Sequence, residues 1–316
     1  MIRTKKNTQT FNKIDTILNV SISEDLFGVK GVPDAILTAD WHLRATIPSC
    51  RKEEFESAQW KKIHFISELQ RKYNIPVLHS GDLFDIWNPP LALVSKSNLH
   101  IPKDFFTIYG NHDLPQHNLE LSYKCGIFNM YTAGKLKLLP GLHWNQEPES
   151  MEYSLTLKNR KILVWHMMTY QGKKLYPGMK DSPAASIIRK TNADLILTGH
   201  NHQSFVEEYK GRLLVNPGCI TRQESDQAEF KPKVYLYYAF DNTVEAIILP
   251  HEKGVVEKAD DVKVKEERDE RINAFISKLN TQWDSTIDFD KNIERFLESN
   301  EITSDVKEWI YKALEK

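Results

Sequence analysis

The chain has 316 residues, of which 41% are hydrophobic and 27% charged, and its formal net charge is −1 at pH 7. This composition argues against a disordered or fibrous chain and against attraction to nucleic acid or membranes through overall charge. The charge is unevenly distributed, because residues 251–316 carry 12 Lys and Arg against 17 Asp and Glu, whereas residues 1–250 carry a net charge of +4. We therefore predict a mildly basic main domain, 1–250, with an extra N-terminal segment, 1–34, and an acidic extension, 251–316.

Cysteine usage and hydropathy bear on the compartment. Cys50, Cys125 and Cys219 are widely spaced and form no CxxC pair, which argues against a disulfide framework and against a cysteine zinc site. No apolar run approaches the ~20 residues that span a bilayer, and no apolar signal-peptide core follows the basic first 13 residues. We expect a cytoplasmic protein that makes no membrane contact.

The first elements expected along the chain alternate between strands and helices. Thr16–Val20 is a candidate edge strand. Five short apolar runs that end in polar turns are typical of buried strands, namely Ala35–Ala39, Pro76–Ser80, Phe105–Tyr109, Lys161–Trp165 and Leu195–Thr198. Apolar residues at helical spacing predict an amphipathic crossover helix over Arg51–Tyr73. Ser182 and Pro183 suit the N-cap and first position of a second crossover helix before the Leu195 strand.

The pattern changes in the last third of the chain. Strands are expected at Leu213–Val215, Val234–Phe240 and Val244–Leu249, linked by turns that favour antiparallel pairing at the end of the sheet system. From about Val262 onward, apolar residues at helical spacing replace the strand pattern. The sequence thus predicts an α/β fold with a helical C-terminal appendage.

Each expected central strand is followed by a polar cluster. The clusters are Asp40-Trp41-His42, Gly81–Asp85, Gly110–Asp113, His166 and Gly199–His202. Open α/β sheets bind their ligands at the carboxyl ends of strands, so we expect these clusters to converge. Carboxylate, imidazole and amide ligands together suit Mn²⁺, Fe²⁺ or Zn²⁺. The sequence therefore predicts a metal site at this edge.

Local geometry suggests how the ligands are arranged. On an extended segment, residues two apart share a face, so Asp40 and His42 can bind one ion together, and His200 and His202 can do the same. Asp82 is the candidate bridge of a binuclear centre with ions ~3.5–4 Å apart. We expect the glycines that precede the ligands to allow sharp turns at strand ends; these are Gly81, Gly110 and Gly199.

The ordered set D-x-H, GD, GNHD, a lone strand-end histidine and GHxH resembles the calcineurin-like metallophosphoesterase superfamily over about Ala35–Arg222. The resemblance implies a sandwich of two central β-sheets flanked by helices. It also implies two divalent metal ions, Mn²⁺ first and Fe²⁺ or Zn²⁺ as alternatives. One ion is expected to bind Asp40, His42, Asp82 and His202, and the other is expected to bind Asp82, Asn111, His166 and His200.

The same resemblance assigns catalytic roles. His112 is expected beside the scissile phosphate, where it stabilises the transition state or protonates the leaving oxygen. Asp85, three residues after Asp82, resembles the aspartate that holds the catalytic histidine in a carboxylate–imidazole dyad. Arg44, Arg51 and Arg222 flank the motifs and are candidates for binding phosphate oxygens.

The motifs also narrow the substrate class. Protein Ser/Thr phosphatases carry the motifs GDxxDRG and GNHE. In this chain Asp85 is followed by Ile86-Trp87, and the third motif ends in Asp113. Both differences argue against a protein phosphatase. The GDLFD–GNHD spacing with a helical extension is most similar to the DNA-repair exonucleases of the SbcD type, which are Mn²⁺-dependent and pair with a coiled-coil ATPase. The chain departs from them at Asp85, where they usually carry histidine, and in Pro250–Asp261, which is too short for their capping domain.

Three functions remain open from the sequence. The first is an exonuclease or phosphodiesterase acting on DNA, with the C-terminal helices binding a partner ATPase or covering the site. The second is a small-molecule phosphodiesterase acting on a cyclic nucleotide or nucleotide. The third is a non-catalytic scaffold, against which the complete ligand set and His112 argue. The sequence does not determine the oligomeric state.

Overall fold

The computed structural model describes residues 31–51, 55–144, 146–147, 155–174 and 182–257, together with Leu297 and Lys307. The chain divides into two compact units, Met1–Val256 and Glu257–Lys316. The expected edge strand near Thr16 and the expected C-terminal helices lie outside the described residues. Within the described residues, no helix is both long and apolar enough to cross a membrane.

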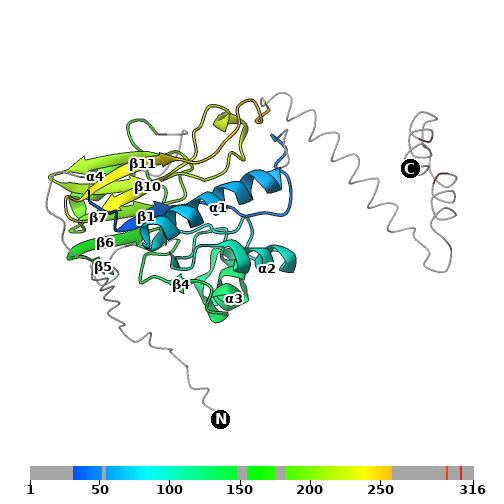
Figure 1. Cartoon of the computed structure of the whole chain (residues 1–316), viewed down its shortest axis with the longest axis horizontal. Coiled ribbons are helices and arrows are strands. Elements are labelled where there is room, and N and C mark those ends of the chain that lie inside the picture. Colours follow the sequence, from blue (N-terminus) through cyan, green and yellow to red (C-terminus); the bar gives the residue numbers. More distant parts are fainter. Residues whose placement is uncertain are drawn as a thin grey trace, which may run out of the picture. The chain divides into compact units, whose positions relative to one another are not determined.

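Two mixed β-sheets form the centre of the first unit (Figure 1). The first has the strand order β11-β10-β1-β2-β3-β4, in which β1 to β4 are parallel and β10 and β11 are antiparallel. Its strands are β1 (Ala35–Thr38), β2 (Val77–His79), β3 (Phe105–Thr107), β4 (Lys137–Leu138), β10 (Lys233–Tyr238) and β11 (Thr243–Ile248).

The second sheet has the order β5-β6-β7-β9-β8. Its three inner strands are parallel, and its two edge strands are antiparallel to their neighbours. These strands are β5 (Leu155–Leu157), β6 (Arg160–Trp165), β7 (Leu195–Thr198), β8 (Phe205–Tyr209) and β9 (Arg212–Asn216). The two sheets therefore each present a run of parallel strands whose carboxyl ends can carry ligands.

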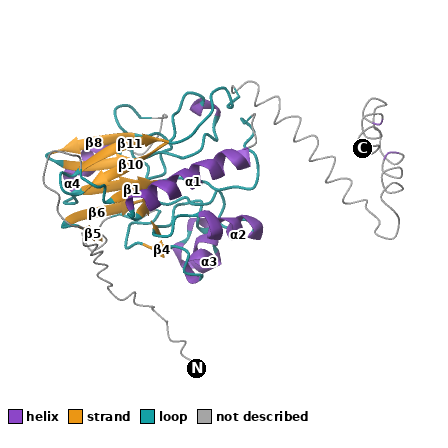
Figure 2. Ribbon diagram, in the orientation of Figure 1, coloured by secondary structure: helices purple, strands orange, loops and turns teal. Residues whose placement is uncertain are grey.

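Helices cover the outer faces of both sheets (Figure 2). On the first sheet these are α1 (Phe55–Tyr73), α2 (Leu91–His100) and α3 (Gly126–Thr132), and on the second sheet it is α4 (Ala184–Lys190). Three buried clusters separate the four layers. The predicted α/β fold with two sheets flanked by helices is confirmed.

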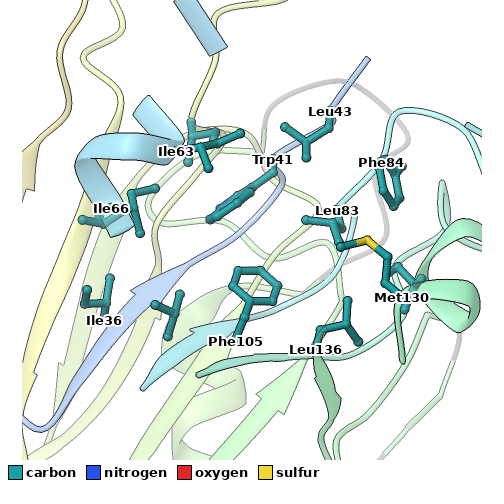
Figure 3. Packing of buried hydrophobic residues seen from close by; sticks show 14 of the residues in the cluster. Ile36, Trp41, Leu43, Ile63, Ile66, Leu83, Phe84, Phe105, Met130 and Leu136 are labelled. Atoms are coloured by element: carbon teal, nitrogen blue, oxygen red, sulfur yellow. The ribbon is translucent and has the colours of Figure 1, made fainter. Parts of the chain in front are cut away.

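The side-chain alternation of β1 explains the layering. Ile36 faces the helices, where it belongs to a cluster with Ile63 and Ile66 of α1 (Figure 3). Its neighbours Ala35 and Leu37 face the second sheet instead. Successive residues of a strand point to opposite faces, so a fully apolar strand indicates burial on both faces. Such burial fixes the register of β1 and therefore the position of the loop that follows it.

All five predicted buried strands are present, but the sequence patterns did not indicate β4, β5, β8, α2 or α3. The two-residue β4 and the largely half-buried β8 lack the continuous apolar run that marks the central strands. Helix α2 begins after Pro90, which makes no side-chain cap hydrogen bond. The expected N-cap of α4 was wrong by one residue, because the structure places Pro183 rather than Ser182 there.

A buried lysine on α1 has a consequence for stability. Lys62 is 3% exposed, and its Nζ donates to the Ala58 carbonyl oxygen at 3.1 Å. Burial, together with the neighbouring charges of Arg51 and Arg222, lowers its pKa to about 7 from the ordinary 10.5. Between these two values the unfolded chain binds a proton that the folded chain does not, so stability should rise with pH across this window.

We expect Lys62→Met to remove this pH dependence. The free energy of unfolding of the unmodified chain should gain about 2 kcal/mol relative to Lys62→Met between pH 7 and pH 9, because each pKa unit corresponds to about 1.4 kcal/mol. Urea unfolding of both proteins at the two pH values measures this. Comparing the two proteins cancels the titration of buried tyrosines and cysteines, and a difference that does not change with pH would contradict the prediction.

Candidate metal centre

The loops after β1, β2, β3, β6 and β7 bring the predicted ligands together. Asp40 and His42 follow β1, Asp82 follows β2, and Asn111 follows β3. In the second sheet, His166 follows β6, and His200 and His202 follow β7. Because each set of strands is parallel, their carboxyl ends open on one edge of each sheet.

The ligand atoms form two groups. In the first, Asp40, His42 and His202 each offer a ligand atom, and these atoms lie within 4.8 Å of one another. The His42 Nε2 and His202 Nε2 atoms are 3.1 Å apart. In the second, the same criterion unites Asp82, His166 and His200.

Asn111 joins the second group through its amide oxygen. Its Oδ1 lies 3.0 Å from His166 Nε2 and 2.8 Å from His200 Nδ1. The two groups therefore contain the ligands that the superfamily resemblance assigned to the two ions. His200 and His202 belong to different groups, whereas local geometry in the sequence led us to expect that they bind one ion together.

Asp82 lies between the groups. Its Oδ2 atom is 3.6 Å from His42 Nε2 of the first group and 3.3 Å from His166 Nε2 of the second. This oxygen is buried and has no hydrogen-bond partner among the described residues. A buried carboxylate oxygen without a partner is costly, so this atom fits a bridging cation, and the residues present suit a binuclear centre.

The electrostatics of the metal-free chain agree with this fit. Burial alone would lower the pKa of His166, but the contact with the Asp82 carboxylate raises this pKa to about 9. Burial also opposes ionisation of Asp82, but His166 holds the pKa of that carboxyl well below its usual range. Burial raises the pKa of Asp40 to about 6. The site thus retains protons that divalent cations would displace on binding.

The backbone at the ligands corrects one prediction. Four of the seven ligands have positive φ, at 48° for Asp40, 43° for His42, 57° for Asp82 and 73° for His200. The Asp40–His42 segment is therefore not extended, and its side chains converge through left-handed turns. Such residues cost of order 1–3 kcal/mol each and persist where the surrounding structure holds them.

Two glycines serve different purposes beside Asp82. Gly81 has a φ of 96° and supplies the expected turn. At Gly110 the reason is space, because a β-carbon there would collide with the Asp82 carboxylate. The glycine of the GNHD motif thus permits close approach of the third ligand loop to the second.

Hydrogen bonds fix the tautomers of two ligand histidines. His166 Nδ1 lies 2.7 Å from the Ser80 carbonyl oxygen and must donate to it, which leaves Nε2 as the coordinating atom. His202 Nδ1 lies 2.8 Å from Glu224 Oε1, which likewise leaves its Nε2 for an ion. A carboxylate behind a metal-binding histidine orients the ring and increases its basicity. Glu224 lies in none of the sequence motifs, so the sequence alone did not indicate its role.

Replacing Glu224 by glutamine should weaken metal binding by about 10–100-fold, the usual effect of removing such a partner. Glutamine keeps the shape of the side chain, so the loss of metal affinity measures the effect of the Glu224 charge on His202. Isothermal titration of the metal-free chain with Mn²⁺ measures it. Asp226→Asn is the matched control, since it removes an exposed carboxylate two residues away; equal affinities for the two variants would contradict the prediction.

His112 is exposed beside the first ligand group. Its ring packs edge-on to that of His42, with centroids 4.6 Å apart, and its backbone N–H donates to Asp82 Oδ1 at 2.8 Å. His112 Nδ1 lies 2.7 Å from the carbonyl oxygen of Asp85. The expected dyad with the Asp85 carboxylate is thus replaced by a contact with the backbone of the same residue.

The Asp85 carboxylate has other partners. Oδ2 lies 3.4 Å from the guanidinium of Arg44, and Oδ1 lies 3.7 Å from His42 Nδ1. Asp85 therefore contacts the candidate ligand His42 through its outer ring nitrogen, as Glu224 contacts His202. One ligand atom each from His42, Asp85 and His112 also lie within 4.8 Å of one another.

Asp113, for which the sequence suggested no role, connects the loops after β2 and β3 by hydrogen bonds. Its carboxylate accepts from the backbone N–H groups of Gly110 at 2.9 Å, Asp82 at 2.7 Å and Phe84 at 3.2 Å. Its place directly after GNH was the only signal available. Asp113 therefore holds Asp82 in position, although it belongs to neither ligand group.

Two of the flanking arginines do not face the site. Arg51 is buried and donates to the Arg222 carbonyl oxygen at 2.9 Å, and Arg222 donates to the Ala228 carbonyl oxygen at 3.1 Å. Their guanidinium groups bind backbone, so the expectation that they hold phosphate is wrong for both. A residue that the sequence analysis did not connect with the metals, Trp144, packs on His200 with ring centroids 4.5 Å apart.

Several solved structures are similar to this chain. One is described as a novel archaeal phosphodiesterase, with 16% identity over 68% of this chain and 99% of that chain and a TM-score of 0.41. Vacuolar Protein Sorting 29 from Cryptosporidium parvum has 19% identity over 71% and 100%, with a TM-score of 0.34. A metallophosphoesterase from Sphaerobacter thermophilus has 13% identity over 75% and 94%, with a TM-score of 0.32.

Sequence comparison gives the family. A search among curated proteins found no match. The profile of the calcineurin-like phosphoesterase superfamily domain matches residues 35–239, which is more than half of the 316 residues. All seven converging ligands and His112 fall within this range. The chain therefore belongs to the calcineurin-like phosphoesterase superfamily.

Proposed function

We propose that this protein is a metal-dependent phosphoric ester hydrolase, and within that class a phosphodiesterase that acts on DNA as an exonuclease. The observation that carries the hydrolase proposal is the arrangement around Asp82. Its Oδ2, which has no hydrogen-bond partner among the described residues and lies 3.3 Å from His166 Nε2, sits between two ligand groups that contain the family's ligand set. This buried carboxylate and the nitrogen and oxygen donors around it suit divalent cations, which hydrolases of this kind use.

The residues supply positioning and proton transfer. Divalent cations, when bound here, provide a water of lowered pKa and positive charge against the phosphate oxygens. Asp82 holds the two positions together, while Ser80 and Glu224 aim the Nε2 atoms of His166 and His202 at them. His112, whose Nδ1 is held by the Asp85 carbonyl, keeps Nε2 for a proton that passes to the leaving oxygen.

The finer parts of the proposal rest on the sequence. The GDLFD and GNHD motifs resemble those of SbcD-type exonucleases, and the net charge of +4 over residues 1–250 suits a polyanionic substrate. We propose Mn²⁺ as the ion, since the mixed oxygen and nitrogen donors accept it. We also propose that residues 251–316 bind a coiled-coil ATPase partner in the cytoplasm.

The test compares a small diester with DNA. The full chain, loaded with Mn²⁺, is assayed on bis-p-nitrophenyl phosphate and on labelled linear duplex and single-stranded DNA, with Asp82→Asn as the inactive control. Cleavage of DNA and of the small diester by the unmodified chain alone is the expected result. Cleavage of the diester with DNA intact would overturn the exonuclease proposal and favour a small-molecule phosphodiesterase. Inactivity on all substrates would overturn the hydrolase proposal.

A further inference from the structure

Two solvent-accessible histidines from different helices, His64 exposed and His100 partly buried, face one another outside the two ligand groups. His64 lies on α1 and His100 is the last residue of α2. His64 Nε2 and His100 Nδ1 are 3.1 Å apart, and the two rings stand edge-on with centroids 4.9 Å apart. The same nitrogen separation occurs between His42 and His202 in the candidate metal centre.

The separation matches that of two ligands on one ion. Zinc–imidazole bonds are about 2.0–2.1 Å long, and tetrahedral geometry then places the two nitrogens about 3.3–3.4 Å apart. The rings of His64 and His100 need to separate by only a few tenths of an ångström to reach it. We propose that this pair is a second metal site, selective for imidazole-preferring ions of the Zn²⁺ class, that joins α1 to α2.

The protonation chemistry permits coordination. In the metal-free pair one ring nitrogen donates its hydrogen to the other; binding needs both facing nitrogens as lone pairs, so the donor ring takes its tautomer with the hydrogen on the opposite nitrogen. Because both rings are neutral, binding of the ion releases no proton from the pair. Desolvation, and then the nearby charges of His64 and Lys96, hold the pKa of His100 below its ordinary value, which favours this neutral form.

The surroundings leave room for the ion's other ligands. Lys96, whose charge acts on His100, forms an ion pair with Glu56 at 2.5 Å, so part of its charge is neutralised. The Trp60 ring lies on one side of the pair, 5.6 Å from the His100 ring centroid. Both histidines are solvent-accessible, so water can complete the tetrahedron.

The two histidines lie on helices that follow two of the ligand loops. Helix α1 follows the loop that carries Asp40 and His42, and α2 follows the loop that carries Asp82 (Figure 1). An ion on His64 and His100 fastens these two helices to each other. Imidazole pairs bind Zn²⁺ in preference to Mn²⁺, so this site can respond to a different ion from the one proposed for catalysis, and its existence does not depend on the proposed activity.

The test uses the full chain saturated with Mn²⁺ and titrated with Zn²⁺ by calorimetry, with thermal unfolding as a second readout. His64→Gln and His100→Gln each remove one ligand, and His251→Gln is the control, since the described part of the chain gives His251 Nδ1 only the Leu249 carbonyl oxygen as partner. Any Zn²⁺ that displaces Mn²⁺ at the candidate centre contributes equally in all four proteins, so it cancels when their stoichiometries are compared.

We expect the unmodified chain and His251→Gln to bind one more equivalent of Zn²⁺ than either ligand variant. Removing either imidazole should weaken this binding about tenfold or more, because both ligands act on one ion. Zinc should also raise the unfolding temperature of only those proteins that keep both histidines. Equal stoichiometry in all four proteins, or a loss in only one ligand variant, would overturn the proposal.

Discussion

Asp82→Asn is expected to lower hydrolysis strongly by weakening the binding of both metal ions, so that at most one ion remains. The substitution keeps the shape of the side chain and an oxygen that can accept the His112 N–H, but it removes the charge shared by the two ligand groups. Loss of metal charge at the reacting phosphate costs several kcal/mol, so kcat/KM should fall about 10³-fold or more.

Metal content separates this prediction from a general loss of structure. Mn²⁺ bound per chain, measured by elemental analysis after gel filtration, should fall from two to none or one, while far-UV circular dichroism stays unchanged. Asp104→Asn serves as the control, since it removes an exposed carboxylate that pairs with Lys137. Two ions retained by Asp82→Asn would refute the bridging role.

His112→Ala is expected to keep the metals and lose turnover. His112 belongs to neither of the two ligand groups that Asp82 links, and its backbone N–H contact with Asp82 survives the change. General acid catalysts contribute about 10²–10⁴-fold, so kcat should fall within that range on a substrate with a poor leaving group. Metal stoichiometry should match that of the unmodified chain.

The leaving group gives the sharper readout. If His112 donates a proton to the leaving oxygen, the loss should be large for an alkyl or nucleoside ester and small for p-nitrophenyl esters, whose leaving group needs no proton. The measurement is kcat for both substrate types with both proteins at saturating Mn²⁺. The same fold-loss on both substrates would exclude the acid role and assign His112 to transition-state binding.

The sequence by itself determined the ligand types and the strands that carry them. A run such as Leu195–Leu197 is apolar because both its faces are buried, and a polar cluster such as His200-Asn201-His202 soon after it has few structural explanations. Motif order and spacing then indicated the family. These features are local along the chain, which is why a single sequence shows them.

Only the tertiary structure decided how the ligands are shared and what supports them. The sequence suggested an extended Asp40–His42 pair, but left-handed backbone at both residues sets their direction. The Asp85 carboxylate lies near Arg44 and His42, and the His112 ring contacts the Asp85 carbonyl. Short-range spacing cannot distinguish a carboxylate from a carbonyl of one residue, because both lie within reach of the same imidazole.

Partners that are distant in sequence were beyond prediction for a related reason. Glu224 meets His202 across 22 positions, and Asp113 meets the Asp82 N–H across 31. His64 and His100 lie 36 positions apart on two helices, one of which the sequence did not reveal. Such contacts arise when layers pack, and no local periodicity records them. Residue types and motif order predict which groups do chemistry, because both can be read along the chain, whereas packing of the two sheets and their helices determines which groups hold them in place.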